Sequence, residues 1–216
     1  LNSDGHIMSY NAHIVSPPHS TRPSGTDEPN LRAQQFLSRP MTMGPGNDAP
    51  QPQGGADRNA VPGYVIPAVC IVRDRPAVVP YRSSAMRGLG AFTNIIALEL
   101  LMESCAEAAG EDAIAYRLAH LDDVRAIAVI EAVGDMAGCC QRIDDVGFGL
   151  GYARYKNSAG YLACIARVVV GDEIKVTDVW SAADVGEAIN PDGTINQIEG
   201  GIVQAISWVL QEEVRY

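Results

Sequence analysis

Residues 17–62 form the longest stretch of the chain without a repeating pattern of apolar residues, and the stretch is rich in proline, glycine, asparagine and serine. Connections between helices and strands are usually only a few residues long. A segment of this length is therefore functional, disordered or wrapped over a neighbouring surface. Before it, apolar and polar residues alternate from His6 to Val15, which predicts a half-buried strand. We expect residues 1–63 and 64–216 to belong to two different lobes.

The middle of the chain has the spacing of helices. Apolar residues recur every three or four positions over 95–109, and a glycine follows directly. Two shorter helices are predicted over 113–120 and 123–134, with Asp112 and Asp122 as the capping residues. These segments predict a small helical cluster.

The second half of the chain returns to strands. Residues 161–170 and 174–180 are separated by a Gly-Asp-Glu turn and predict a hairpin. A proline-glycine turn at 190–193 then leads into a helix whose apolar stripe consists of Ile198, Ile202, Ala205 and Val209. The predicted fold is α/β (α+β), with the helical cluster packed on a mixed or antiparallel sheet.

Composition limits the possible partners. The net charge is −10, which argues against nucleic acid and against an anionic membrane surface. No apolar run approaches the ~20 residues needed to span a bilayer, so we expect no membrane span. Small molecules or proteins are the expected partners.

The cysteines and histidines do not form an evident reactive set. The five cysteines lack the paired CxxC spacing of zinc or iron-sulfur sites, and we expect them to be reduced and mostly buried. His120 is the only histidine outside the first twenty residues, so no Ser-His-Asp or Cys-His set is suggested. We expect no metal ligands from this chain.

The stretch from Arg87 to Gly90, Arg-Gly-Leu-Gly, stands directly before the most apolar helical run. Glycines at this place let backbone amides approach a ligand, and a helix N-terminus favours an anion such as phosphate. The alternative is structural: the glycines allow a tight turn and the arginine pairs with an acidic neighbour. A single GxG does not decide between these interpretations.

A second stretch, from Asn190 to Gly201, combines a turn with polar residues in the first helical turns. Gln197 carries an amide that both donates and accepts hydrogen bonds, which suits the edge of a heterocycle. The adjacent Gly200 and Gly201 each cost roughly 1 kcal/mol inside a helix relative to alanine, so close approach of a ligand or of another element is expected there. Taken alone, tight packing is the more common reason.

Taken together, the chain resembles the molybdenum-binding large subunits of the xanthine dehydrogenase and aldehyde oxidase family, above all the branch of nicotinate dehydrogenase and isoquinoline oxidoreductase. The resemblance covers nearly the whole chain. It rests on seven stretches in the expected order, HSTRP, GGADRNAVPGYVIP, YRSSAMRGLGAFTN, ALELLMES, YRLAHLDD, GYARYKN and NPDGTINQIEGGIVQAISWVLQEEV.

The resemblance implies roles for particular residues. In the family, the arginine of an RGxG stretch binds substrate and stabilises developing negative charge, which indicates Arg87 as the catalytic residue. The glutamine of a QxEG stretch approaches the pterin, which indicates Gln197. The implied cofactor-binding residues are Gly88, Gly90, Ala91, Gln197 and Gly200.

The implied reaction is hydroxylation of a heteroaromatic ring or an aldehyde carbon, with water as the oxygen source. The implied cofactor is a molybdenum-pterin cofactor, expected as molybdopterin cytosine dinucleotide. Iron-sulfur clusters are expected on a separate small subunit. The family branch includes both cytoplasmic and exported members, and we expect a cytoplasmic protein, with a periplasmic one as the alternative.

Three of the family's stretches are missing from these 216 residues: the GQG loop, the GGxFG loop and the terminal GE stretch with the catalytic glutamate. We therefore expect a central fragment that is inactive by itself, with the 64–216 lobe incomplete at its C-terminal end. The alternative is a non-catalytic protein-binding or assembly module of the same ancestry.

Overall fold

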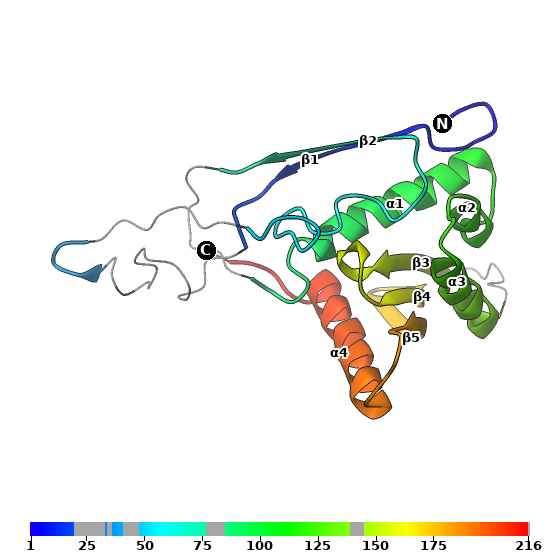
Figure 1. The fold of residues 1–216 in the computed structure, drawn as a ribbon. Coiled ribbons are helices and arrows are strands. Elements are labelled where there is room, and N and C mark those ends of the chain that lie inside the picture. The colour runs from blue at the N-terminus through cyan, green and yellow to red at the C-terminus, as the bar shows by residue number, and fades with distance from the viewer. Residues whose placement is uncertain (20–32, 34–35, 41–47, 77–84, 139–144, 216) are drawn as a thin grey trace. The chain divides into compact units, whose positions relative to one another are not determined.

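The computed structural model describes residues 1–19, 33, 36–40, 48–76, 85–138 and 145–215. By their contacts these residues form two compact units, whose helices and strands are labelled in Figure 1. Unit 1 comprises residues 1–122 and 153–159, and unit 2 comprises 123–152 and 160–216. The sequence predicts two cofactor-binding lobes that meet at residue 63. These lobes are defined by cofactor contacts and not by compactness, so the two units do not test them and they stay a prediction.

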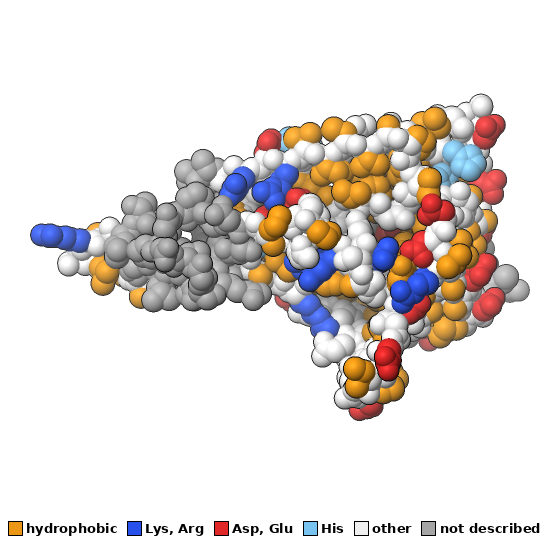
Figure 2. All heavy atoms as spheres, in the orientation of Figure 1, with side chains coloured by type: hydrophobic (Ala, Val, Ile, Leu, Met, Phe, Trp, Pro, Cys, Tyr) orange, Lys and Arg blue, Asp and Glu red, His pale blue; other side chains and the backbone are white. Residues whose placement is uncertain are grey.

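Unit 1 contains a two-stranded parallel sheet. Strand β1 (Ser9–Val15) pairs with β2 (Ala68–Asp74), with Ser9 opposite Ala68. The predicted N-terminal strand is thus confirmed, although its pairing with a strand beyond the long loop has no local signal. Figure 2 shows hydrophobic side chains gathered over these two strands. Val69 and Val72 of β2 are exposed.

Two helices complete unit 1, and both begin and end close to where the sequence predicts. Helix α1 (Ala91–Ala109) ends at Gly110, which adopts the left-handed conformation with φ of 70°. Helix α2 (Ala113–Ala119) is capped by Asp112, whose side chain accepts from the amides of the first turn. The core of the unit includes Leu98, Met102 and Ala106 of α1, together with Ile7, Tyr10, Tyr64 and Tyr116.

Unit 2 is a three-stranded sheet in the order β3-β4-β5, with helix α3 packed on it. Strands β4 (Tyr161–Val170) and β5 (Ile174–Asp184) form the predicted antiparallel hairpin. Alternate residues of β4, Tyr161, Ala163 and Ile165, are buried, as are Ala126, Val129, Ile130 and Val133 of α3. Strand β3 (Val146–Arg154) was not predicted as a strand.

The predicted bounds of α3 were wrong at both ends. The helix spans Val124–Ala137, and its cap is Asp123, whose carboxylate accepts from the Arg125 amide, instead of Asp122. Gly134 lies inside the helix, which ends at Gly138 in the left-handed conformation. A single interior glycine lowers helix stability by only about 1 kcal/mol, and the buried face of α3 offsets this cost.

Helix α4 (Pro191–Leu210) is the longest helix described. Pro191 occupies its first turn, and Asn190 caps it by accepting from the Gly193 amide at 3.0 Å. None of its residues is fully buried, and Val203 and Val209 are exposed. The predicted apolar stripe is therefore only partly covered. Over the described residues, no helix is long and apolar enough to cross a membrane.

Candidate cofactor site

Arg87 is exposed and lies in a tight turn directly before α1. Gly88 and Leu89 both adopt left-handed conformations, with φ of 84° and 53°, and the Leu89 amide donates to the Met86 carbonyl at 3.1 Å. A Cβ on Gly88 would meet no neighbouring atom closer than 3.9 Å. Gly88 is thus explained by its backbone conformation, and the space beside its Cα is open.

At position 90 a glycine is required for a different reason, namely close packing against another backbone segment. A Cβ at this position would overlap the carbonyl of Ala56, and the Gly90 amide donates to the Gly55 carbonyl at 3.0 Å. Asn94, one turn further along α1, donates from its side chain to the carbonyls of Ala56 and Arg58, each at 2.9 Å. The start of α1 is therefore fastened to the 55–58 backbone, and Gly90 permits that close contact.

The 54–60 loop, which contacts the start of α1, is held in place by hydrogen bonds from the Arg58 and Asn59 side chains. Arg58 is buried and donates to the Gly54 carbonyl at 3.1 Å and to the Tyr155 hydroxyl at 2.6 Å. Asn59, also buried, donates to the Arg154 carbonyl at 2.8 Å and accepts from the Lys156 amide at 2.9 Å. Residues 54–60 of the long aperiodic segment are therefore packed against the rest of unit 1. Most of residues 20–47 lie outside the described residues.

The beginning of α1 has an electropositive character. No side chain caps the helix at Gly90, and the first turn carries no acidic residue. Helix N-termini carry partial positive charge from their amides, and Arg87 adds a full charge directly before this turn. The turn is therefore suited to an anionic or hydrogen-bond-accepting group.

Gln197 lies in the second turn of α4, and its side chain is exposed, as is Gly200 one turn later. Thr194, Ile195 and Ile198 of the same helix line a cleft against β5, and Gln197 and Gly200 do not. Gln197 and Gly200 are therefore exposed outside this cleft.

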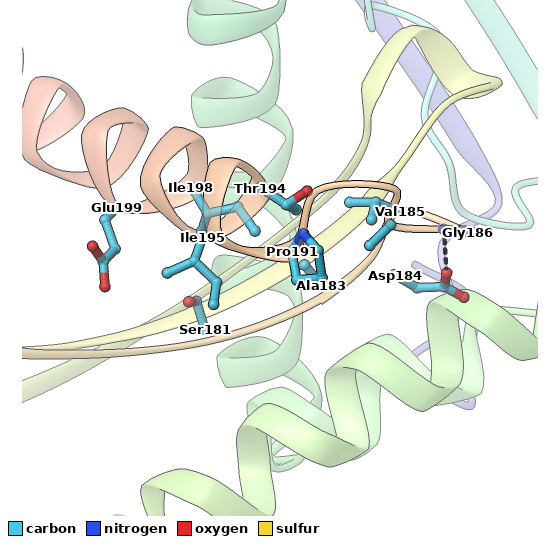
Figure 3. A pocket seen from close by; sticks show the side chains of 11 residues that line it. Ser181, Ala183, Asp184, Val185, Gly186, Pro191, Thr194, Ile195, Ile198 and Glu199 are labelled. Carbon is cyan, nitrogen blue, oxygen red and sulfur yellow. Dashed lines mark hydrogen bonds between the residues drawn. The ribbon is translucent and has the colours of Figure 1, made fainter.

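The cleft between β5 and α4 has a volume of about 530 Å³ (Figure 3). Its lining is mainly apolar, with polar groups at the edges. The residues are Ser181, Ala183, Asp184, Val185, Gly186, Ala188, Pro191, Thr194, Ile195, Ile198 and Glu199. None of the predicted site residues lines it.

A charged pair fixes one edge of this cleft. The Arg125 guanidinium donates to both carboxylate oxygens of Asp184, each at 2.6 Å, and lies 4.6 Å from the ring centre of Tyr161. The Gly186 amide also donates to Asp184, at 2.9 Å, as Figure 3 shows. The hydrogen bond from Arg125, and secondarily that from Gly186, lowers the pKa of Asp184 to about 2. The Arg125–Asp184 pair thus joins the start of α3 to the connection that leads into α4.

The donor set fits an organic cofactor better than a metal held directly by the chain. Within the described ranges, no group of three or more His, Cys, Asp or Glu side chains could hold a metal ion. Cys70 is exposed, contrary to expectation, Cys105 and Cys164 are half-buried, and Cys139 and Cys140 lie outside the described residues. In unit 1 the Arg87 guanidinium and the open backbone of Gly88, and in unit 2 the Gln197 amide, are groups that can each hold oxygen or nitrogen atoms of a pterin or its phosphate.

Comparison with known proteins identifies the class of this α+β chain. Residues 145–216, which include β3, β4, β5 and α4, match the family described as molybdopterin cofactor-binding domain. Gln197 and Gly200 lie inside the matched segment, whereas Arg87 lies before it.

Two curated proteins are similar over most of the chain. A nicotinate dehydrogenase subunit of Pseudomonas putida is 34% identical over 186 residues, covering 70% of this chain and 16% of that protein. The beta subunit of isoquinoline 1-oxidoreductase from Brevundimonas diminuta is 35% identical over 150 residues, covering 64% of this chain and 19% of that protein. The chain belongs to the molybdopterin-binding xanthine dehydrogenase and aldehyde oxidase family of oxidoreductases. It spans less than a fifth of the length of these relatives.

The two predicted stretches lie on different units, Arg87 to Ala91 on unit 1 and Gln197 with Gly200 on unit 2. Their participation in one site stays a prediction. Asn94, Arg58 and the Arg125–Asp184 pair were not predicted from the sequence. Their partners lie far away along the chain, and no local spacing marks them.

Proposed function

We propose that the chain is part of the large subunit of a molybdenum hydroxylase that hydroxylates a carbon of an N-heteroaromatic ring or an aldehyde, with oxygen from water. The names of both relatives refer to nitrogen heterocycles, which supports a heteroaromatic substrate. The chain corresponds to a small share of those proteins, so we propose that it is inactive when isolated.

The observation that carries the proposal is the position of Gln197. It lies in the segment that matches the molybdopterin cofactor-binding domain, its side chain is exposed, and it does not line the cleft that α4 shares with β5. We propose that Gln197 donates to and accepts from the pterin edge, and that the exposed Gly200 lets the cofactor approach the helix.

Arg87 has the complementary role in the proposal. When bound, the molybdenum centre supplies the redox chemistry. The exposed guanidinium of Arg87 orients the substrate and stabilises negative charge that develops on it, an effect typically worth several kcal/mol for a preorganised cation. Gly88 offers open backbone to the cofactor. The amides of Gly90 and Ala91 already donate to the carbonyls of Gly55 and Gly88, so we propose that these two residues contribute by holding the turn.

The cofactor is proposed to be molybdopterin cytosine dinucleotide, and the iron-sulfur clusters are assigned to a separate small subunit. Each of the two relatives is named as one subunit of its enzyme, which supports an assembly of several subunits. Residues 1–63 and 64–216 are proposed to contribute to two cofactor-binding lobes of the large subunit.

The test is the cofactor content of the full-length gene product. We expect purified wild-type protein to contain molybdenum and pterin in comparable molar amounts, and Gln197→Ala to retain several-fold less pterin at unchanged thermal stability. Full-length protein that contains neither molybdenum nor pterin would refute the proposal and favour an assembly module. Unchanged pterin content in Gln197→Ala would refute the role of this residue alone.

A further inference from the structure

A short turn in unit 1, Tyr155–Asn157, is held in an unfavourable backbone conformation. Lys156 and Asn157 have φ of 57° and 53°, in the left-handed region that residues other than glycine rarely adopt. The Asn59 side chain maintains this shape, because it accepts from the Lys156 amide at 2.9 Å and donates to the Asn157 side chain at 3.0 Å. Backbone strain that neighbouring residues hold in place is concentrated at functional sites. Here it fixes where the Tyr155 and Lys156 side chains lie.

The Tyr155 hydroxyl is oriented as a donor toward solvent. It accepts from the Arg58 guanidinium at 2.6 Å, and a guanidinium cannot accept a hydrogen bond in return. Among the described residues, no acceptor lies within hydrogen-bond distance of this hydroxyl. The Tyr155 side chain is 39% exposed. The hydroxyl hydrogen is therefore available to a group that arrives from outside the turn.

The charge around this hydroxyl is positive. Arg58 is only 6% exposed, and in the described part of the chain its guanidinium bonds to neutral groups alone, the carbonyls of Gln53 and Gly54 and the Tyr155 hydroxyl. The half-buried Lys156 has its ammonium 5.4 Å from the Tyr155 ring centre, and no described carboxylate pairs with it. Buried cations in proteins are normally paired with an anion.

The acidic residues of the same loop do not supply that anion. Asp48 and Asp57 both accept from Arg73, each at 3.3 Å, and both also accept from backbone amides. Neither carboxylate bonds to Arg58. Two cations therefore stand beside an exposed hydroxyl donor, and within the described residues neither cation has an acidic partner.

We infer that the Tyr155 hydroxyl and the Lys156 ammonium bind a phosphate group, with Arg58 as the positioning residue that turns the hydroxyl hydrogen outward. The hydroxyl and the ammonium can each donate to a separate oxygen of one phosphate, and the buried guanidinium adds attraction for its charge. The phosphate can belong to the pterin cofactor or to a free anion. With the cofactor as its source, the inference rests on the proposed function and deepens it. Binding of free phosphate can be measured independently of that function.

The test uses the full-length protein and four variants: Tyr155→Phe, Lys156→Gln, Lys156→Arg and Lys175→Gln. The Phe variant keeps the ring and removes the hydroxyl, whereas the Gln and Arg variants of Lys156 remove and keep the charge. Lys175 is the matched control, since it is the only other lysine of the chain and its side chain is exposed on β5. Calorimetry measures binding of inorganic phosphate to protein produced without cofactor. Pterin per polypeptide is quantified in the loaded protein after gel filtration, and the fold is checked by thermal unfolding.

Loss of one hydrogen bond to a charged group weakens binding by roughly 10- to 100-fold. We expect Tyr155→Phe and Lys156→Gln to weaken phosphate binding by about this factor at unchanged melting temperature. Lys156→Arg should restore most of the affinity, and Lys175→Gln should match wild type. Lower pterin content in the same two variants would assign the phosphate to the cofactor, and unchanged pterin content would assign it to a free anion.

No loss of phosphate binding and no loss of pterin in either variant would overturn the inference. A lower melting temperature of Lys156→Gln, without a loss of phosphate or pterin, would also overturn it, because the lysine would then pair with a carboxylate elsewhere in the full-length protein. Wild-type protein without pterin would refute the proposed function, and the phosphate titration would still decide whether this site binds an anion.

Discussion

Arg117 donates from its Nε to Oε2 of Glu99 across 3.0 Å, and the arginine side chain has no exposed surface. The same guanidinium donates to the Glu99 carbonyl at 3.2 Å and to the Ala113 carbonyl at 3.0 Å. The Tyr64 hydroxyl donates to the second oxygen of Glu99 at 2.8 Å. This buried network joins α1, α2 and the segment after the long loop.

Replacing one member of this network should lower the free energy of unfolding substantially. Arg117→Leu leaves the Glu99 carboxylate buried without its cation, a change that typically costs 3–5 kcal/mol. We expect a loss of about this size in the free energy of unfolding, measured by urea denaturation. Glu103→Gln is the control, since Glu103 meets the same arginine from a half-exposed position, and its loss should stay below about 1 kcal/mol. Equal effects of the two variants would contradict the assignment.

Gly90→Ala should destabilise unit 1. The added Cβ would overlap the Ala56 carbonyl, which is backbone and cannot turn away. We expect a loss of about 1–3 kcal/mol, the usual cost of overpacking, visible as a lower melting temperature. Gly147→Ala, where a Cβ meets no atom within 4 Å, should change stability much less. Similar melting temperatures for both variants would show that the close contact is absent in solution.

Arg87→Ala should lower turnover in the full-length enzyme without a change in folding, because the side chain is exposed. Removal of one preorganised donor to developing charge typically lowers kcat by a factor of roughly 10² to 10³. Steady-state kinetics with a heteroaromatic substrate, at pterin content equal to wild type, measures this effect. Wild-type turnover in the variant would refute the proposed role of Arg87.

The Arg125–Asp184 pair should be resistant to acid. Its hydrogen bonds lower the pKa of Asp184 from 3.8 to about 2, so the folded state binds this proton less readily than the unfolded state. The stabilising contribution is therefore fully present above pH 3.8 and is lost as the pH falls through about 2. Carboxyl titration by NMR should show the lowered pKa in wild type and a higher pKa in Arg125→Gln, which stays below 3.8 because the Gly186 amide still donates to the carboxylate. An unshifted pKa in wild type would contradict the pairing.

His120 should be held with its ring nitrogens in fixed roles. Its Nε2 accepts from the Ile7 amide at 3.1 Å, so its Nδ1 carries the hydrogen and donates to the Tyr116 carbonyl at 2.8 Å. His120→Ala leaves the Ile7 amide buried without a partner, and we expect a loss of about 1–3 kcal/mol in stability. Nitrogen chemical shifts should report the hydrogen on Nδ1 with Nε2 as the acceptor, and the reverse assignment would contradict this arrangement.

The parts of the fold that were predicted correctly are those with local signals. Asp112 and Gly110 mark helix ends because capping depends on the next few residues only. Strand β3 was missed because Gly147, Gly149 and Gly151 lower its strand propensity. It forms because β4 pairs with it, and that pairing has no signature in the strand itself.

In the candidate site, too, features with a local sequence signal could be predicted, and features that depend on distant residues could not. Arg87 and Gln197 are exposed, and their contacts to a ligand stay predictions. The reason for Gly90 could not be predicted, since it depends on Ala56, 34 positions earlier in the chain. Likewise, Arg58 bonds to Tyr155 across 97 positions, and no spacing rule connects the two.

The loop that fastens α1 has a consequence for how these sequences can evolve. Surface loops ordinarily accept insertions and deletions. In the segment 54–59, however, Gly55 and Ala56 touch the start of α1, and the Arg58 and Asn59 side chains bond to residues 154–156. A single inserted residue would shift these contacts out of register together. Relatives should therefore conserve the length of this segment, while the β4–β5 turn, where a Cβ on Gly171 would meet nothing within 4 Å, can vary in length between lineages.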